Sequence, residues 1–222
     1  MRVCRASLEG VKKYLGTMPG LVICGGDDDS GLQSDVWRLD LATLQWGPLP
    51  SLVVARDGHA WCTVRGSLVV LGGCINDDEE DVISSVEMLS AWGAGGEGAF
   101  TNLPPLSCGG VGGAVAVAVE ESTSAAGQVL LLGLLGGEGE QVDEDEFGVP
   151  TVQLVDLATS VCTPQPDCLN DYRRDVRFTA VRMPDGRVVC ACGGDSHKSV
   201  EVLGPPAGGA SSEYRPGQSF PR

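Results

Sequence analysis

The chain has 222 residues, of which 42% are hydrophobic and 20% are charged, and its formal net charge is −15 at pH 7. This apolar fraction supports a folded core and excludes disorder throughout, while the 32 glycines favour tight turns over long helices. The negative charge argues against binding to nucleic acid or to an anionic membrane, because both depend on clustered Lys and Arg.

Cysteine usage indicates a reducing, cytoplasmic compartment, with the nucleus as the other intracellular location left open. The nine cysteines are an odd number, no CxxC occurs, and several lie in apolar runs, where a thiol behaves as a small hydrophobic side chain. The N-terminal segment lacks the apolar stretch of a secretory leader. The longest apolar segments, Ala114–Val119 and Val129–Leu135, are shorter than the ~20 residues that cross a bilayer.

An apolar run that ends in Gly-Gly occurs four times along the chain. The four runs are Leu21–Gly26, Leu68–Gly73, Leu131–Gly137 and Val188–Gly194, and their first paired glycines are 47, 64 and 57 residues apart. Repeats of roughly this length are typical of solenoids and propellers. Because glycine has no Cβ, we expect each pair to let a strand turn sharply beside a neighbouring segment.

Two further motifs recur at a nearly constant offset. Asp-Leu-Ala-Thr stands at 40–43 and again at 156–159, an offset of 116, and Ser-Val-Glu stands at 85–87 and at 199–201, an offset of 114. Agreement between two unrelated segments indicates internal repetition rather than chance.

Each repeat is predicted to form four strands. The first precedes a turn, at Arg65–Ser67 or Pro184–Gly186; the second ends at Gly-Gly; the third holds the Asp-Leu or Val-Glu motif. The fourth lies around Trp46, Phe100–Leu103 or Val161–Thr163. Apolar runs without alternation indicate strands covered on both faces. We therefore predict an all-β fold, a β-propeller of about four four-stranded antiparallel blades.

The chain resembles kelch-repeat proteins over about residues 20–204. The kelch motif has an apolar strand ending in Gly-Gly, then a Tyr and a Trp separated by six residues, and an Arg-x-x-His. Here Leu39 stands at the Tyr position, Trp46 at the Trp position, and Arg56 and His59 form the Arg-x-x-His. The resemblance implies a propeller, and it implies structural roles for Gly25, Gly26, Trp46, Arg56, His59, Gly72, Gly73, Gly136, Gly137, Gly193 and Gly194.

The predicted organisation has three parts. Residues 1–20 form an N-terminal segment that could complete a blade, residues 21–204 hold the repeats, and residues 205–222 form a Gly/Pro/Ser-rich tail. Kelch propellers usually have five to seven blades, and the chain contains four apolar runs that end in a Gly-Gly pair. The termini complete one blade together, the chain self-associates with another copy, or the sequence is incomplete; all three remain open, because an unclosed propeller exposes sheet edges.

The loops after the Gly-Gly pairs are acidic in three of the four repeats. Equivalent propeller loops emerge on one face, so we expect them to attract a basic segment of a partner protein. Trp92, in a Gly-rich stretch, is the expected interface anchor. The candidate partner-binding residues are Asp27, Asp28, Asp29, Asp77, Asp78, Glu79, Glu80, Trp92, Asp143, Glu144 and Asp145. Charges kept for solubility and a calcium site are the alternatives, although no loop has EF-hand spacing.

The expected function is non-enzymatic protein binding, as an adaptor or scaffold, with no cofactor and no metal. The alternative is a carbohydrate-active or mutarotase-like enzyme with a site at the propeller axis, for which the candidate side chains are Arg56, Arg173, Arg174 and Arg177. A copper oxidase site of two histidines and two tyrosines is disfavoured, since His59 and His197 are the only histidines. No GxSxG motif supports nucleophilic catalysis.

Three of the four tryptophans lie in predicted strands. Trp37, Trp46 and Trp61 are therefore expected to belong to the core, where a large aromatic side chain contributes most by burial.

Overall fold

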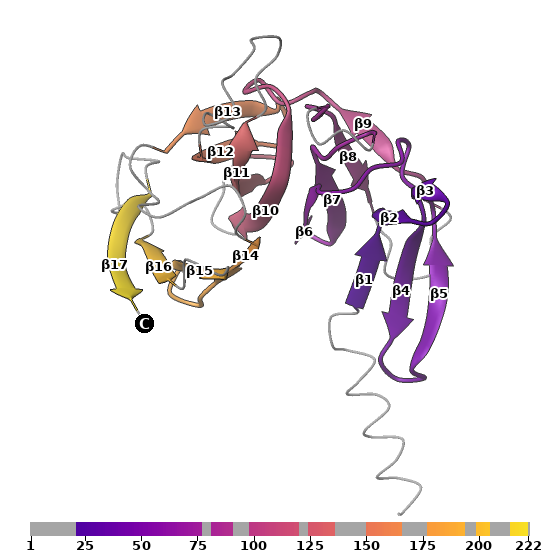
Figure 1. Ribbon diagram of the computed structural model, residues 1–222, viewed down its shortest axis with the longest axis horizontal. Helices are drawn as coiled ribbons and strands as arrows, with labels where there is room; N and C mark the ends of the chain where they lie inside the picture. Colours follow the sequence, from indigo (N-terminus) through magenta and orange to yellow (C-terminus); the bar gives the residue numbers. More distant parts are fainter. Residues whose placement is uncertain are drawn as a thin grey trace, which may run out of the picture.

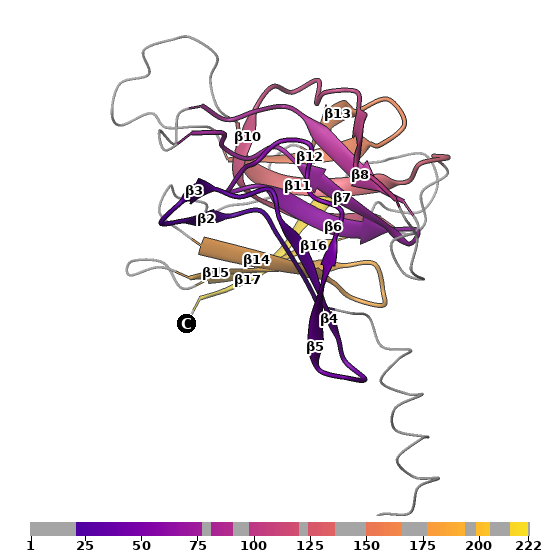
Figure 2. The ribbon, with the colours of Figure 1, turned by 90° about the vertical axis from the view of Figure 1, so that its right-hand side faces the viewer.

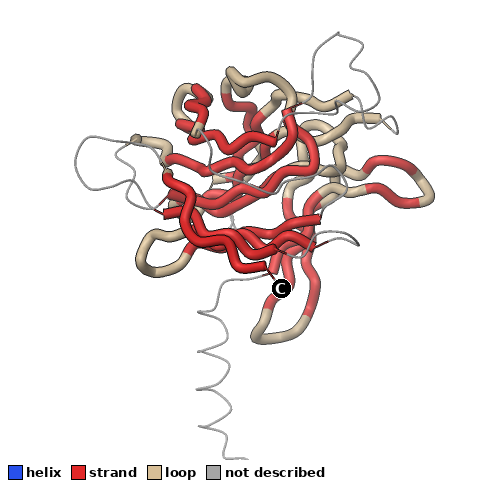
Figure 3. Tube along the Cα trace, turned by 60° about the vertical axis from the view of Figure 1, so that its left-hand side comes forward, coloured by secondary structure: helices blue, strands red, loops and turns tan. Residues whose placement is uncertain are grey.

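The computed structural model describes residues 21–76, 81–90, 98–119, 124–135, 150–165, 177–193, 199–204 and 214–221. Every regular element among them is a β-strand, as Figure 3 shows along the chain. The strands form three four-stranded sheets, one three-stranded sheet and a two-stranded hairpin, and all pairings are antiparallel. The all-β prediction is confirmed.

The first sheet has the order β1-β4-β5 and carries the hairpin β2–β3 between its first two strands. The bounds are β1 Leu21–Cys24, β2 Asp27–Asp28, β3 Gly31–Leu32, β4 Val36–Asp40 and β5 Gln45–Leu49. The N-terminal segment predicted to complete this sheet, residues 1–20, lies outside the described residues.

The second sheet follows chain order from β6 to β9. Its strands are β6 Ala60–Val64, β7 Ser67–Leu71, β8 Val86–Leu89 and β9 Thr101–Leu103. Arg65 and Gly66 join the first two strands with φ of 50° and 78°. Positive φ at both central residues matches the right-handed twist of a hairpin, and this turn is the predicted one.

The third and fourth sheets are also four-stranded and follow chain order. The third consists of β10 Val111–Val119, β11 Gln128–Leu135, β12 Pro150–Asp156 and β13 Val161–Pro164. The fourth consists of β14 Arg177–Arg182, β15 Val188–Gly193, β16 Ser199–Gly204 and β17 Arg215–Pro221.

The repeated Asp-Leu-Ala-Thr sequence forms the same turn twice, between the last two strands of the first and third sheets. The Asp40 Oδ1 accepts a hydrogen bond from the Ala42 N–H at 2.7 Å, and the Asp156 Oδ1 accepts one from the Ala158 N–H at 2.9 Å. An aspartate that bonds the backbone two residues ahead fixes a turn locally. The sequence repeat is therefore a structural repeat.

The prediction of a tail at residues 205–222 is wrong for its final part. Residues 215–221 form β17, which pairs with β16 from Ser199↔Pro221 to Gly204↔Arg215. Tyr214, at its start, is 3% exposed, and its N–H donates to the Gln165 Oε1 at 2.7 Å. The partner strand and a buried tyrosine outweigh the turn-forming composition, because propensity is a weak signal beside tertiary pairing.

The four sheets succeed one another around an arc, with the first and the fourth at its ends (Figures 1 and 2). We call the side of a sheet toward the preceding sheet its front face, and the side toward the following sheet its back face. The front of the first sheet is thus the side away from the second sheet, and the back of the fourth is the side away from the third. Three apolar clusters fill the junctions between successive sheets. At the first junction, Val22 and Val36 of the first sheet pack with Leu68, Val70 and Leu89 of the second.

The expectation that three tryptophans belong to the core is wrong. Trp37, Trp46 and Trp61 are 40%, 44% and 41% exposed. Trp37 and Trp46 lie on the front face of the first sheet, which no described sheet covers. Trp61 lies on β6, the first strand of its sheet, where burial alternates along the strand. A strand pattern predicts which residues share a face but not whether another sheet covers that face.

Candidate functional site

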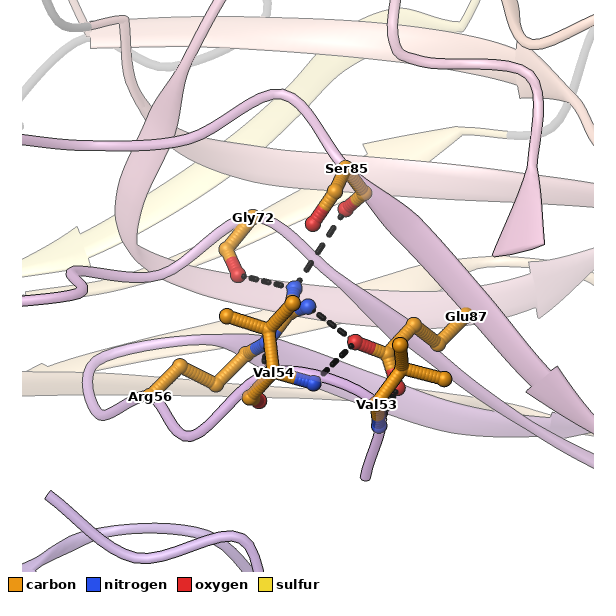
Figure 4. A network of polar contacts seen from close by, with 6 residues as sticks. All are labelled: Val53, Val54, Arg56, Gly72, Ser85 and Glu87. Carbon is orange, nitrogen blue, oxygen red and sulfur yellow. Dashed lines mark hydrogen bonds and ion pairs between the residues drawn. The ribbon is translucent and has the colours of Figure 1, made fainter. Parts of the chain in front are cut away.

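An ion pair between Arg56 and Glu87 is the centre of the junction between the first two sheets (Figure 4). Both side chains are 0% exposed. The Arg56 Nη1 donates to the Gly72 carbonyl at 2.9 Å, and its Nε donates to the Val54 carbonyl at 3.2 Å. Burial lowers the pKa of Arg56, and the Glu87 carboxylate opposes this shift. The guanidinium thus joins the loop entering the second sheet to the Gly-Gly turn that leaves its second strand.

Glu87 completes this network from β8. Its Oε2 accepts a hydrogen bond from the Val53 N–H at 2.6 Å, and its Oε1 accepts one from the Val54 N–H at 3.1 Å. A buried carboxylate with an arginine and two backbone donors is well satisfied. Sequence reasoning missed Glu87 as a partner of Arg56. The available signal was the recurrence of a glutamate between apolar residues, at Glu87 and at Glu201, which is 3% exposed.

His59, predicted to be a structural repeat residue, lies beside the same network. Its Nε2 lies 3.3 Å from the Cys24 Sγ. Burial, together with the charge of Arg56, lowers the pKa of His59 to about 4, and burial raises the pKa of Cys24 to about 12. At neutral pH both groups are therefore uncharged, which suits a contact inside a sheet junction better than proton transfer.

The first glycines of two Gly-Gly pairs meet the next sheet in the same way. Gly25 has φ of 58°, and a Cβ there would come within 2.5 Å of the Arg56 carbonyl oxygen. Gly72 has φ of 65°, and a Cβ there would come within 2.2 Å of the Val111 carbonyl oxygen. Both a left-handed backbone and close approach therefore require glycine. Gly193 lies at the end of β15, while Gly136, Gly137 and Gly194 lie outside the described residues.

The first acidic loop forms the exposed hairpin β2–β3. Asp27, Asp28 and Asp29 are all exposed, and the hairpin lies at the end of the first sheet opposite the β4–β5 turn (Figure 2). The Asp28 Oδ1 accepts hydrogen bonds from the Ser30 N–H at 2.7 Å and from the Gln33 Nε2 at 2.9 Å. Asp28 therefore shapes the turn, whereas Asp27 and Asp29 present carboxylates to solvent.

The other acidic loops lie mostly outside the described residues. The candidates Asp77, Asp78, Glu79, Glu80, Trp92, Asp143, Glu144 and Asp145 lie outside the described residues. For the second loop only its ends are described, where the Asn76 side-chain amide donates to the Asp81 carboxylate.

A cavity of about 550 Å³ lies beside the first strands of the second, third and fourth sheets. Thr63 and Arg182 are its polar lining residues, and the others are Cys62, Ala116, Val117, Ala118, Ala180, Val181, Met183 and Pro184. Of the four arginines considered for an axial site, one has a described side chain. Arg56 is bonded to Glu87 at the first sheet junction, Arg173 and Arg174 lie outside the described residues, and the Arg177 side chain is likewise not described.

Two negative findings apply to the described ranges alone. Within them, no three His, Cys, Asp or Glu side chains are grouped so that they could hold a metal ion. The same part of the chain contains no helix long and apolar enough to span a membrane.

Comparison with known proteins adds no relative. No protein-family model matches the chain, and no curated protein matches its sequence.

Proposed function

We propose that the four sheets are blades of a kelch-type β-propeller and that the chain binds a protein partner through its loops, as a non-enzymatic adaptor or scaffold. Three four-stranded sheets in chain order, stacked around an arc, support this architecture. The recurrence of a left-handed glycine against the next sheet, at Gly25 and Gly72, supports the assignment of one repeat to one blade.

The exposed acidic hairpin β2–β3 is the observation that carries the binding function. Asp27 and Asp29 present two carboxylates on a loop held by hydrogen bonds to Asp28, so their positions are set before a partner arrives. Loops on a rigid scaffold are where binding residues concentrate. These carboxylates lie on a chain with a net charge of −15, which favours a partner segment rich in Lys and Arg. Such a segment is attracted from a distance, and its binding is weakened by salt.

The cavity lining supports this function over the carbohydrate-active alternative. A sugar site needs several polar side chains that converge on the ligand, and Thr63 and Arg182 are the polar groups in the described cavity. Arg56, the axial candidate nearest to the repeat motif, is bonded to Glu87.

Titration of a labelled Lys/Arg-rich peptide by fluorescence anisotropy tests the proposal. The double variant Asp27→Asn/Asp29→Asn should lose about fivefold in affinity, roughly 1 kcal/mol. The control Asp40→Asn/Asp185→Asn removes the same charge from two exposed turns elsewhere and should leave the affinity unchanged. Equal losses in both variants, or no binding by the wild type, would overturn the proposal.

A further inference from the structure

Two free cysteines from distant segments meet at the outer edge of the third sheet. Cys108 lies in the connection between β9 and β10, and Cys162 lies on β13. Their sulfur atoms are 2.9 Å apart, neither is in a disulfide, and both residues are half-buried rather than enclosed. The pair is therefore close enough to react and open to a small reagent.

Hydrogen bonds hold the two segments together independently of the sulfurs. The Cys162 N–H donates to the Ser107 Oγ at 2.9 Å, and the Ser107 N–H donates to the Ser160 carbonyl at 3.1 Å. The thiols are thus brought together by the fold, which lowers the entropic cost of joining them.

The two thiols differ in acidity. The hydrogen bond from Cys108 lowers the pKa of Cys162 to about 6, while the same contact raises the pKa of Cys108. A thiolate is the attacking species in disulfide exchange, so Cys162 is the nucleophile and Cys108 the second thiol.

We propose that Cys108 and Cys162 form a reversible dithiol–disulfide site that reacts with a low-molecular-weight disulfide. The Cys162 thiolate attacks one sulfur of oxidised glutathione, forming a mixed disulfide and releasing one glutathione thiolate. Cys108 then loses its proton and attacks the Cys162 sulfur, forming the intrachain disulfide and releasing the second glutathione. The protein loses two electrons and two protons, and one oxidised glutathione becomes two reduced molecules. The bond would join the β9–β10 connection to β13.

Peptide mapping by mass spectrometry after treatment with oxidised glutathione tests this site. In the wild type, a Cys108–Cys162 cross-linked peptide should appear, while Cys24 and Cys62, both buried with a pKa of about 12, stay unmodified in the same digest. Cys108→Ser should instead accumulate the glutathione adduct at Cys162, and Cys162→Ser should react at Cys108 at least about tenfold more slowly. Separate stable adducts on both cysteines, or no reaction in folded wild-type protein, would overturn the proposal.

An independent observation concerns the front face of the first sheet. Strand register places Ile23, Trp37 and Pro48 in one row and Leu21, Leu39 and Trp46 in the next. Leu21 and Ile23 are 50% and 52% exposed. Six adjacent apolar side chains on a sheet face that no described sheet covers are typical of an interaction surface.

The opposite end of the arc carries a second apolar face. On the back of the fourth sheet, register places Val181, Val189 and Val202 in one row and Thr179, Ala191 and Val200 in the next. Val181 is 57% exposed, and the other five are partly or fully exposed.

Inside the chain, every junction joins the back of one sheet to the front of the next. Leu68 and Val70, on the front of the second sheet, are both 0% exposed beneath the back of the first. Leu21 and Ile23 hold the same positions of the repeat, and no described sheet covers them. Within the described part of the chain, the front of the first sheet thus lacks the back face of a neighbouring sheet, and the back of the fourth sheet has no sheet packed on it.

We infer that the back of the fourth sheet of a second copy covers the front of the first sheet. The contact is heterologous. Two copies close a ring if the curvature of the arc allows both interfaces to form, and otherwise the copies form an open head-to-tail oligomer. The two sets of side chains are complementary in size, with two tryptophans on one face and small or β-branched residues on the other.

Light scattering after size separation tests this inference. The buffer contains about 0.15 M salt, which screens the repulsion between the negatively charged copies. The wild type should exceed the 23.0 kDa of one chain, reaching at least twice that mass at high concentration. Ile23→Asp and Val181→Asp should each weaken the assembly at least about tenfold, while Leu44→Asp, at a 72% exposed turn residue, should not.

Mixing the two variants distinguishes the proposed contact from other assemblies. Ile23→Asp keeps an intact back face and Val181→Asp keeps an intact front face, so their mixture should form a heterodimer through one interface. If Val181→Asp alone still dimerises as the wild type does, the contact is front to front and the inference is wrong. A wild type that stays at 23.0 kDa at every concentration would also overturn it.

Discussion

The first and second sheets contain nearly the same strand in two different surroundings. In β1, Leu21, Val22, Ile23 and Cys24 are 50%, 3%, 52% and 7% exposed. In β7, the corresponding Leu68, Val69, Val70 and Leu71 are all 0% exposed. The local sequence, the Gly-Gly ending and the following antiparallel strand are shared, but β7 also pairs with β6, whereas β1 has β4 as its one described partner. The difference therefore comes from what lies on each face and along the first edge of each strand. Among the described sheets, the second lies between two neighbours, and the first has a neighbour on its back only.

The strands that follow the Gly-Gly turns, β4 and β8, show the same contrast in their chemistry. Register aligns Ile23 with Trp37 in the first sheet and Val70 with Glu87 in the second. Glu87 is buried because the preceding loop supplies Arg56 and two backbone N–H groups. Trp37 has no described loop in front of it and is 40% exposed. One position in the repeat therefore holds a buried ion in one sheet and an exposed aromatic in the other.

The largest difference should come from breaking the buried ion pair at the junction. Glu87→Gln leaves the Arg56 charge buried without a counter-ion, and we expect a loss of about 3–5 kcal/mol in the free energy of unfolding, measured by urea denaturation. The exposed pair of Arg187 and Asp185, with side chains 54% and 51% exposed, provides the control: Asp185→Asn should leave the denaturation midpoint unchanged. A small effect of Glu87→Gln would mean that the pair is not buried in solution.

The matched leucines test the covered face against the uncovered one. Leu68→Ala should reduce the free energy of unfolding by about 2–5 kcal/mol, because it leaves a cavity between two sheets. Leu21→Ala, at the same position of the first sheet, should cost under about 1 kcal/mol in dilute, monomeric protein. Equal losses in dilute protein would show that the front face of the first sheet is covered within one chain.

Substitution of the first glycine of a Gly-Gly pair should destabilise both sheets alike. The turn is the same in the two sheets, whereas the packing on their front faces differs. Gly25→Ala and Gly72→Ala each force a Cβ against a backbone carbonyl at positive φ, so each should cost at least about 1–3 kcal/mol. At Gly26, φ is 107° but nothing lies within 4 Å of an added Cβ, so Gly26→Ala should cost less than either. Thermal unfolding of the three variants provides the comparison, and a neutral Gly72→Ala would contradict the close approach.

The smallest effect at neutral pH should come from His59. Its folded pKa of about 4 lies below the ordinary value near 6.5, so the unfolded chain binds a proton first as the pH falls. Stability should therefore decrease between about pH 6.5 and pH 4, by at most about 1.4 kcal/mol per pH unit from this group. His59→Gln should reduce that slope in urea titrations at several pH values. An unchanged slope would place His59 in solvent.

Local chemistry made several features predictable. Apolar runs ending in Gly-Gly predicted β1, β7, β11 and β15, Asp40 and Asp156 indicated identical turns, and Arg65–Ser67 indicated a hairpin, because each signal acts within a few residues. The acidic hairpin at Asp27–Asp29 was predictable as a loop for the same reason.

Long-range contacts were not predictable in this way. The strand β17, the Arg56–Glu87 pair and the contact between Cys108 and Cys162 each join segments far apart in the chain, and composition or spacing gives no distance between such segments. Exposed tryptophans were missed because alternation marks a face without showing whether another sheet covers it.

By itself, the sequence determined the all-β class, the order of the strands that flank the Gly-Gly turns and the residues that share each face, since these follow from backbone turns and side-chain alternation over short distances. The tertiary structure alone decided which faces are buried, which charge meets which, and which two of the cysteines touch. The physical reason is that burial and pairing depend on the neighbouring sheet. Among the described sheets, the same apolar strand is covered on both sides in the middle of the arc and on one side at its end.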